Sequence, residues 1–383
     1  MLQDTTSGQT SERPIAGAAQ GSDQGADQGA RRLVVDSIGT ADAVAVASVA
    51  RGLRVAPERV AAALYRAPAV LADGLSADIA TRMASLLAEI GLSVRIDDAD
   101  SPRPEAQALM DVAIHMRDAR RLPSVAALVG RFIGASHAQA LAQLTAPPGL
   151  VLGRVSRATA DALARRLAEE PAEVVAAPLS DARYDLIDDG LPAARREAVR
   201  REAGASAAPA EAFPVLAADL DAARADQLWR RHRRAELRAL DRRFARYDLV
   251  LTAPAATAAG RTLLIERAGV PAEILETVFA ALPITLVEGL GPEEAAEEAA
   301  LYRAAGLEAA ARLVTFQRLH LRIDAGQDAD RAMRALKGLG LSAETGDPRP
   351  PYRTPALSEL EARFARAVLE EAGVAVRYEE AGP

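Results

Sequence analysis

The sequence predicts an α+β protein of about four tandem, small, two-layer α/β repeats, with a long basic helical insertion and a disordered N-terminal tail. Three observations predict this fold class. One order of elements, β-α-α-β-α-β, recurs along the 383 residues. Proline, glycine and helix-capping residues return at corresponding places in that order. Hydrophobic residues make up 50% of the chain and aromatic residues only 3%, and the abundance of alanine favours helices.

The chain divides on this basis into a tail over residues 1–30, repeats over 31–100, 108–179, 247–316 and 317–383, and an insertion over 180–246. The tail is rich in Gln, Gly, Ser and Asp and buries too little apolar surface to order itself. It also lacks a basic segment followed by an apolar one, so it is not a secretory signal. The last repeat is degenerate, because residues 347–351 include three prolines and cannot form a helix.

The first repeat shows the order of elements most clearly. We expect a strand at 33–35, helices over 41–52 and 57–66, a connector over 67–76, a helix to Ile90 and a strand over 92–97. Pro57 suits the first position of a helix, where its missing N–H costs nothing. Ser76 is a natural N-cap, and Gly91 ends the third helix.

The other repeats follow the same order. Their opening strands are expected at 112–116, 247–251 and 319–323, and their closing strands at 173–176 and 374–378. Larger apolar residues occur at every second position of these strands, as at Val112, Ile114 and Met116. This alternation predicts one polar sheet face in each repeat.

The connectors carry a family resemblance. In the first repeat the residues are Ala67-Pro68, Leu71, Gly74-Leu75-Ser76 and Gly91; in the third they are Pro283, Leu286, Glu288-Gly289-Leu290 and Gly306. The fourth repeat carries Met333–Leu341, which ends in Gly-Leu-Gly-Leu. This pattern resembles the C-terminal domain of the bacterial large-subunit ribosomal stalk protein, whose fold is similar to that of the Clp protease adaptor.

The resemblance implies three helices on one face of a three-stranded sheet. It also implies a basic, factor-binding surface on the first helix of a repeat. Arg51 keeps one basic position in the first repeat. The fourth repeat keeps Arg331, Arg334 and Lys337, so we expect this repeat to carry any binding of translation factors.

The insertion is the most basic segment. Its apolar spacing predicts one long helix over 216–246. The part from 224 to 246 contains nine arginines and three acidic residues, which gives a local charge of about +6 (9 − 3). The candidate partner-binding residues there are Trp229, Arg230, Arg231, Arg234 and Arg238. Three interpretations stay open: an exposed connecting helix with acidic–arginine pairs, a helix that contacts RNA phosphates, and a helix that docks on acidic repeats.

Composition excludes several kinds of chemistry. The chain has no cysteine, which excludes disulfides, thiolate metal sites and cysteine nucleophiles. The net charge of −7 argues that the protein as a whole does not bind polyanions. The four histidines, His115, His137, His232 and His320, lack metal-ligand spacing, and we expect ordinary surface histidines, with His115 and His320 facing out from a sheet. We identify no catalytic residue, no metal site and no cofactor.

The sequence therefore predicts a non-enzymatic, cytoplasmic protein that acts as a protein–protein interaction scaffold or adaptor and does not enter a membrane. Three alternatives remain: a translation- or ribosome-associated protein, an RNA-associated protein that uses the insertion, and an enzyme of unrecognised type.

Overall fold

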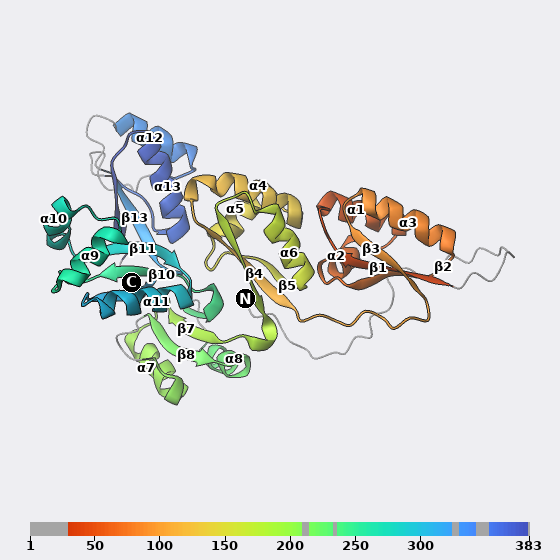
Figure 1. The fold of residues 1–383 in the computed structure, drawn as a ribbon, viewed down its shortest axis with the longest axis horizontal. Coiled ribbons are helices and arrows are strands. Elements are labelled where there is room, and N and C mark those ends of the chain that lie inside the picture. The colour runs from red at the N-terminus through yellow and green to blue at the C-terminus, as the bar shows by residue number, and fades with distance from the viewer. Residues whose placement is uncertain (1–29, 209–213, 233–235, 324–328, 342–351, 382–383) are drawn as a thin grey trace. The chain divides into compact units, whose positions relative to one another are not determined.

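A computed structural model describes residues 30–208, 214–232, 236–323, 329–341 and 352–381 (Figure 1). The chain forms two compact units, Met1–Asp181 and Ala182–Pro383. Both mix helices with small antiparallel sheets. Over the described residues, the first unit holds two sheets and the second holds three, and in each sheet the strand that comes first in the chain is central. We call each sheet with its helices a module and number the modules in chain order.

Module 1 has the expected order of elements around a sheet β2-β1-β3. Its elements are β1 (Arg31–Ser37), α1 (Ala43–Leu53), α2 (Pro57–Tyr65), β2 (Ala69–Leu75), α3 (Ala77–Glu89) and β3 (Ser93–Asp98). As expected, Pro57 is the first residue of α2, and the Ser76 hydroxyl caps α3 by accepting the Ile79 N–H. The cap and the terminal turn at Gly91 set the two ends of α3, which connects β2 to β3, the two strands that pair with β1.

Module 2 repeats this order around a sheet β5-β4-β6. Its elements are β4 (Met110–Met116), α4 (Leu122–Ile133), α5 (His137–Thr145), β5 (Leu150–Val155), α6 (Arg157–Arg166) and β6 (Ala172–Pro178). Ser136 and Gln139 form a capping box at the start of α5, in which each side chain accepts the other residue's backbone N–H.

Module 3 corrects the expected long helix over 216–246. That segment contains β8 (Val215–Leu220), α8 (Ala222–Arg231) and β9 (Leu237–Asp241), and the module begins with β7 (Tyr184–Asp188) and α7 (Ala193–Ala203). Asp221 starts α8 by accepting the Arg224 N–H at 2.8 Å. The backbone on either side of α8 pairs with β7, at Leu186↔Ala217 and Tyr184↔Asp241. Pairing with β7 therefore overrides the helical spacing of the leucines.

Modules 4 and 5 complete the second compact unit. Module 4 contains β10 (Tyr247–Leu251), α9 (Ala258–Glu266), α10 (Leu275–Ala280), β11 (Ile284–Leu290), α11 (Pro292–Ala304) and β12 (Ala309–Leu313). Module 5 contains β13 (Arg318–Ile323), α12 (Ala329–Gly338), β14 (Tyr352–Arg353), β15 (Leu357–Ser358), α13 (Glu359–Glu371) and β16 (Val376–Glu380). Residues 347–351, the proline-rich segment for which we excluded a helix, lie outside the described residues.

A β-bulge recurs at one place in four of the five sheets. Two residues of the second strand lie opposite one residue of the central strand: 73–74 opposite Arg32, 153–154 opposite Asp111, 218–219 opposite Asp185, and 288–289 opposite Asp248. The second residue of each pair has a left-handed backbone, with φ of 71° at Gly74, 57° at Arg154, 57° at Asp219 and 68° at Gly289. Glycine adopts this conformation without strain, whereas Arg154 and Asp219 do not.

A carboxylate holds the bulge in three of these modules. Asp111, Asp185 and Asp248 accept the N–H of the left-handed residue at 3.0, 2.9 and 3.0 Å. Without this acceptor, the amide that the bulge removes from the strand ladder would have no partner in the sheet.

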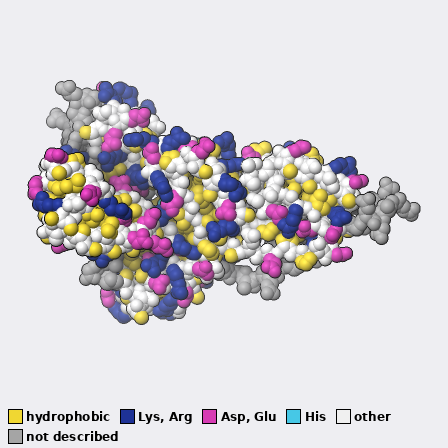
Figure 2. Space-filling model, in the orientation of Figure 1, with side chains coloured by type: hydrophobic (Ala, Val, Ile, Leu, Met, Phe, Trp, Pro, Cys, Tyr) yellow, Lys and Arg dark blue, Asp and Glu magenta, His cyan; other side chains and the backbone are white. Residues whose placement is uncertain are grey.

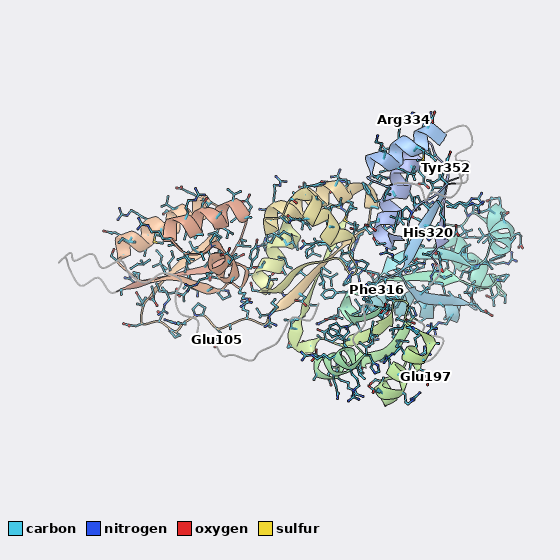
Figure 3. The ribbon with its side chains drawn as sticks, turned by 180° about the vertical axis from the view of Figure 1, so that it is seen from behind. Glu105, Glu197, Phe316, His320, Arg334 and Tyr352 are labelled. Atoms are coloured by element: carbon cyan, nitrogen blue, oxygen red, sulfur yellow. The ribbon has the colours of Figure 1, made fainter. Side chains whose placement is uncertain are left out.

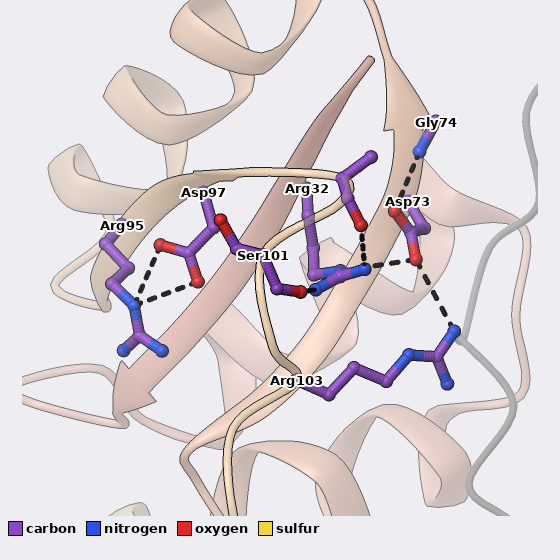
Figure 4. A network of polar contacts seen from close by, with 8 residues as sticks. Arg32, Asp73, Gly74, Arg95, Asp97, Ser101 and Arg103 are labelled. Atoms are coloured by element: carbon purple, nitrogen blue, oxygen red, sulfur yellow. Dashed lines mark hydrogen bonds and ion pairs between the residues drawn. The ribbon is translucent and has the colours of Figure 1, made fainter. Parts of the chain in front are cut away.

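In module 1 a different carboxylate accepts the N–H of the left-handed bulge residue, as Figure 4 shows. Arg32 occupies the position of the aspartates, and Asp73 accepts the N–H of Gly74 at 3.1 Å. The buried Arg32 guanidinium lies 3.3 Å from Asp73 and donates to the carbonyl of Ser101 at 2.8 Å, and Arg103 lies 3.6 Å from Asp73. The chain that follows β3 is thereby held across the sheet.

The central strands correct the expectation of one polar face per sheet. Neighbouring residues of a central strand, which point to opposite faces, are both fully buried in Leu33 and Val34 and in Leu186 and Ile187. In module 1, the chain around Ser101 helps to cover the second face.

Modules 1 and 2 contact each other through the end of α2. The Tyr65 carbonyl accepts the Ser156 N–H and the Thr159 hydroxyl, both at 2.9 Å, and the Tyr65 hydroxyl donates to the Phe132 carbonyl at 2.6 Å. The Arg166 guanidinium lies 5.4 Å from the centre of the Phe132 ring. Burial of the Tyr65 hydroxyl raises its pKa to about 12.

The bulge carboxylate gives a direct test. We expect Asp111→Ala to destabilise the first compact unit by about 1 kcal/mol, because the Arg154 N–H loses its acceptor. Calorimetric unfolding of the full chain should show a lower melting temperature for one transition. Asp100→Ala, an exposed aspartate in a turn, is the control and should change nothing. Equal melting temperatures for both variants would show that the carboxylate does not hold the bulge.

Candidate functional site

The predicted partner-binding residues lie on three different parts of the fold. Arg51 is exposed near the end of α1, in the first compact unit. Trp229, Arg230, Arg231 and Arg238 belong to α8 and β9 of module 3, and Arg234 lies outside the described residues. Arg331, Arg334 and Lys337 are on α12 of module 5. Exposed members of the set occur on two helices: Arg230 and Arg231 on α8, and all three basic residues on α12.

Helix α12 presents a basic face because its apolar residues follow the helical period. Ala332 and Leu336 are fully buried in the module 5 core against residues of α13 and β13. On the other side, Arg331, Arg334 and Lys337 are exposed. Met333 is 39% exposed, so the face combines positive charge with an apolar side chain.

The three basic residues of α12 are not equivalent. Arg331 donates to the carbonyl of Ala372 at 3.3 Å, at the end of α13, where a cation also interacts favourably with the helix dipole. Figure 3 shows Arg334 on the outer side of α12. Arg334 and Lys337 form no ion pair within the described part of the chain. These two residues are therefore available to a partner, and Arg331 also serves the fold.

Three arginines of module 3 that we predicted to bind a partner are paired with carboxylates of the same module. Arg230 pairs with Asp226 at 2.9 Å, Arg231 with Glu202 at 3.1 Å and Arg238 with Asp189 at 2.9 Å. Two of these carboxylates come from outside the segment that appeared strongly basic, since Glu202 is on α7 and Asp189 follows β7. This arrangement agrees with the first of the three interpretations, acidic–arginine pairs, although the long connecting helix itself is absent.

Glu202 and Trp229 fix the geometry of that module. Glu202 accepts from His232 at 2.9 Å and from Arg231, and these hydrogen bonds lower the pKa of its carboxyl. The Trp229 indole packs partly buried against the module core and donates its N–H to the Leu237 carbonyl at 3.2 Å. A role for Trp229 in partner binding remains a prediction.

Figure 2 shows the resulting surface, on which basic and acidic side chains are interspersed over the face in view. Charge pairing of this kind is invisible to a count along one stretch of sequence. The acidic residues within 182–226, on the other elements of the module, are the sequence feature that could have indicated these ion pairs.

Two of the four histidines are buried, although we expected all four on the surface. His320 is 7% exposed, and its Nδ1 donates to the Thr354 carbonyl at 2.7 Å. Thr354 lies between β14 and β15, where the second strand of module 5 is interrupted, and this chain folds over His320. His232 is 8% exposed against Glu202. His115, half-buried on β4, does not face freely outward as expected, whereas His137 is exposed at the start of α5.

Sequence reasoning missed a group of carboxyls in modules 4 and 5. Burial raises the pKa of Asp248 and of Glu359, while Arg363, 3.3 Å from Glu359, opposes that change. Asp185 of module 3 likewise has a raised pKa because it is buried. The bulge already accounts for Asp185 and Asp248, which hold left-handed residues.

The described residues contain no group of three or more His, Asp or Glu side chains placed to hold a metal ion. Among the same residues, no helix combines the length and the apolar character needed to cross a bilayer. Comparisons with protein-family models, with curated proteins and with solved structures found no match to this chain.

The division of roles on α12 can be tested by stability. We expect Arg331→Ala to destabilise the chain by roughly 0.5 kcal/mol, because the Ala372 carbonyl loses a cationic donor. Arg334→Ala should leave the stability unchanged, since Arg334 forms no ion pair among the described residues. Chemical denaturation monitored by circular dichroism provides the measurement. A larger loss in Arg334→Ala than in Arg331→Ala would contradict this assignment.

Proposed function

We propose that this chain is a non-enzymatic scaffold or adaptor that binds another protein through module 5. The modules act as tandem repeats of the fold of the ribosomal stalk C-terminal domain, with module 3 as an additional copy that has one helix fewer. The recurrence of element order and of the bulge before the third helix supports common descent of the modules.

One observation carries the proposal: α12 exposes Arg334 and Lys337 beside Met333, whereas Arg230, Arg231 and Arg238 of module 3 are each paired with a carboxylate. A partner that fits α12 supplies carboxylates for the two cations and an apolar side chain for Met333. An acidic amphipathic helix or loop of a protein has this chemistry.

The position of α12 also favours one more specific function. It is the first helix of its module, and the resemblance places the factor-binding surface of the stalk family on that helix. A translation factor or ribosomal component is therefore the second candidate partner. The RNA alternative has less support, because the pairing of Arg230, Arg231 and Arg238 leaves fewer cations for phosphates.

A pull-down with the tagged full chain tests the proposal. We expect one set of proteins to bind in the presence of RNase and to be reduced about tenfold or more by Arg334→Glu combined with Lys337→Glu. The matched control is Arg157→Glu combined with Arg165→Glu, which makes the same charge change at exposed positions of α6. The captured proteins, identified by mass spectrometry, then distinguish translation factors from other partners.

Three results would count against the proposal. Binding that RNase abolishes would favour the RNA alternative. Equal losses in both double variants would indicate a nonspecific effect of charge. Binding that survives reversal of Arg334 and Lys337 would exclude α12 as the contact surface.

A further inference from the structure

Helix α3 of module 1 carries an apolar stripe on its exposed side. Ile79, Leu86 and Ile90 are 43%, 61% and 37% exposed, and Met83 between them is partly buried. Their spacing of four, three and four residues is that of the seam between two paired helices. Solvent-exposed leucine and isoleucine in this pattern indicate a surface that another helix covers.

The corresponding side of α6 in module 2 already forms a protein contact. Counted from the N-cap serines, Thr159 occupies the position of Ile79, and Arg166 that of Leu86. Thr159 donates to the Tyr65 carbonyl, and Arg166 donates to the Thr40 carbonyl. Isoleucine and leucine have no donor for such carbonyls, so α3 cannot make the contact that α6 makes. Its stripe suits an apolar helix instead.

The charged residues beside the stripe favour one orientation of a helix that packs on it. Arg82 and Glu89 are both exposed on one flank of α3 and form no ion pair with other described residues. If two α3 helices pack antiparallel about a two-fold axis, Ile79 meets Ile90 of the other copy and Met83 meets Leu86. Arg82 then lies near Glu89 of the other copy, and the symmetry makes this ion pair twice.

We infer that α3 is a self-association surface, through which two copies of this chain form an antiparallel helix pair. The stripe and its charges are complementary to themselves, which an isologous interface requires. A single pair of 13-residue helices buries less than the roughly 800 Å² per partner of a standard interface, so the dimer is weak and dissociates on dilution.

Sedimentation equilibrium of the full chain over micromolar to millimolar concentrations tests this inference. We expect a mass that rises from 40.2 kDa toward twice that value as concentration increases. Leu86→Glu should weaken dimerisation at least about tenfold, because it places a charge in the seam. The matched control is Leu301→Glu, at the corresponding position of α11, where the leucine is 41% exposed but no apolar stripe accompanies it.

A charge exchange tests the orientation. Arg82→Glu and Glu89→Arg should each weaken the dimer about fivefold, and the two substitutions combined in one chain should restore it. A chain that stays monomeric at every concentration overturns the inference and leaves the stripe to a different protein. Equal effects of Leu86→Glu and Leu301→Glu, or a charge exchange that does not restore association, would also overturn it.

Discussion

The bulge in the second strand is the constraint on which the modules depend. It puts a left-handed residue one position before the strand's last residue, and the N-cap of the third helix follows that last residue. Thus Arg154 precedes Val155 and the cap Ser156, and Asp219 precedes Leu220 and the cap Asp221. A carboxylate from the central strand therefore fixes both where the sheet turns and where the helix begins.

Variations of this device account for the differences among modules. Module 1 replaces the aspartate with Arg32, whose guanidinium binds Asp73 and the chain after β3. Module 5 replaces it with His320, and there the second strand is interrupted and Thr354 hydrogen-bonds both His320 and Leu321. Each replacement buries a polar group together with the partner that satisfies it, which keeps the cost of burial low.

The sequence allowed the element order of modules 1, 2 and 4 to be predicted, because caps such as Ser76 and helix starts such as Pro57 act locally. Module 3 could not be predicted in the same way. Its leucines fit a helical period, and only pairing with β7, about 30 to 55 residues away in sequence, makes Leu216 and Leu240 strand residues. The basic residues of α12 were predicted from the family resemblance of residues 333–341. The carboxylate partners of Arg231 and Arg238 could not be predicted from one segment, because they lie on other elements.

Surface charge has two uses in this chain. In module 3 it joins elements of one module, and on α12 it remains exposed beside Met333. This difference between paired and exposed charges depends on module 3 forming a sheet. Backbone chemical shifts and amide exchange over 214–241 test the presence of that sheet most directly. We expect strand shifts at 215–220 and 237–241 around a short helix, with a protected amide at Asp219. Continuous helical shifts from Leu216 onward would contradict it.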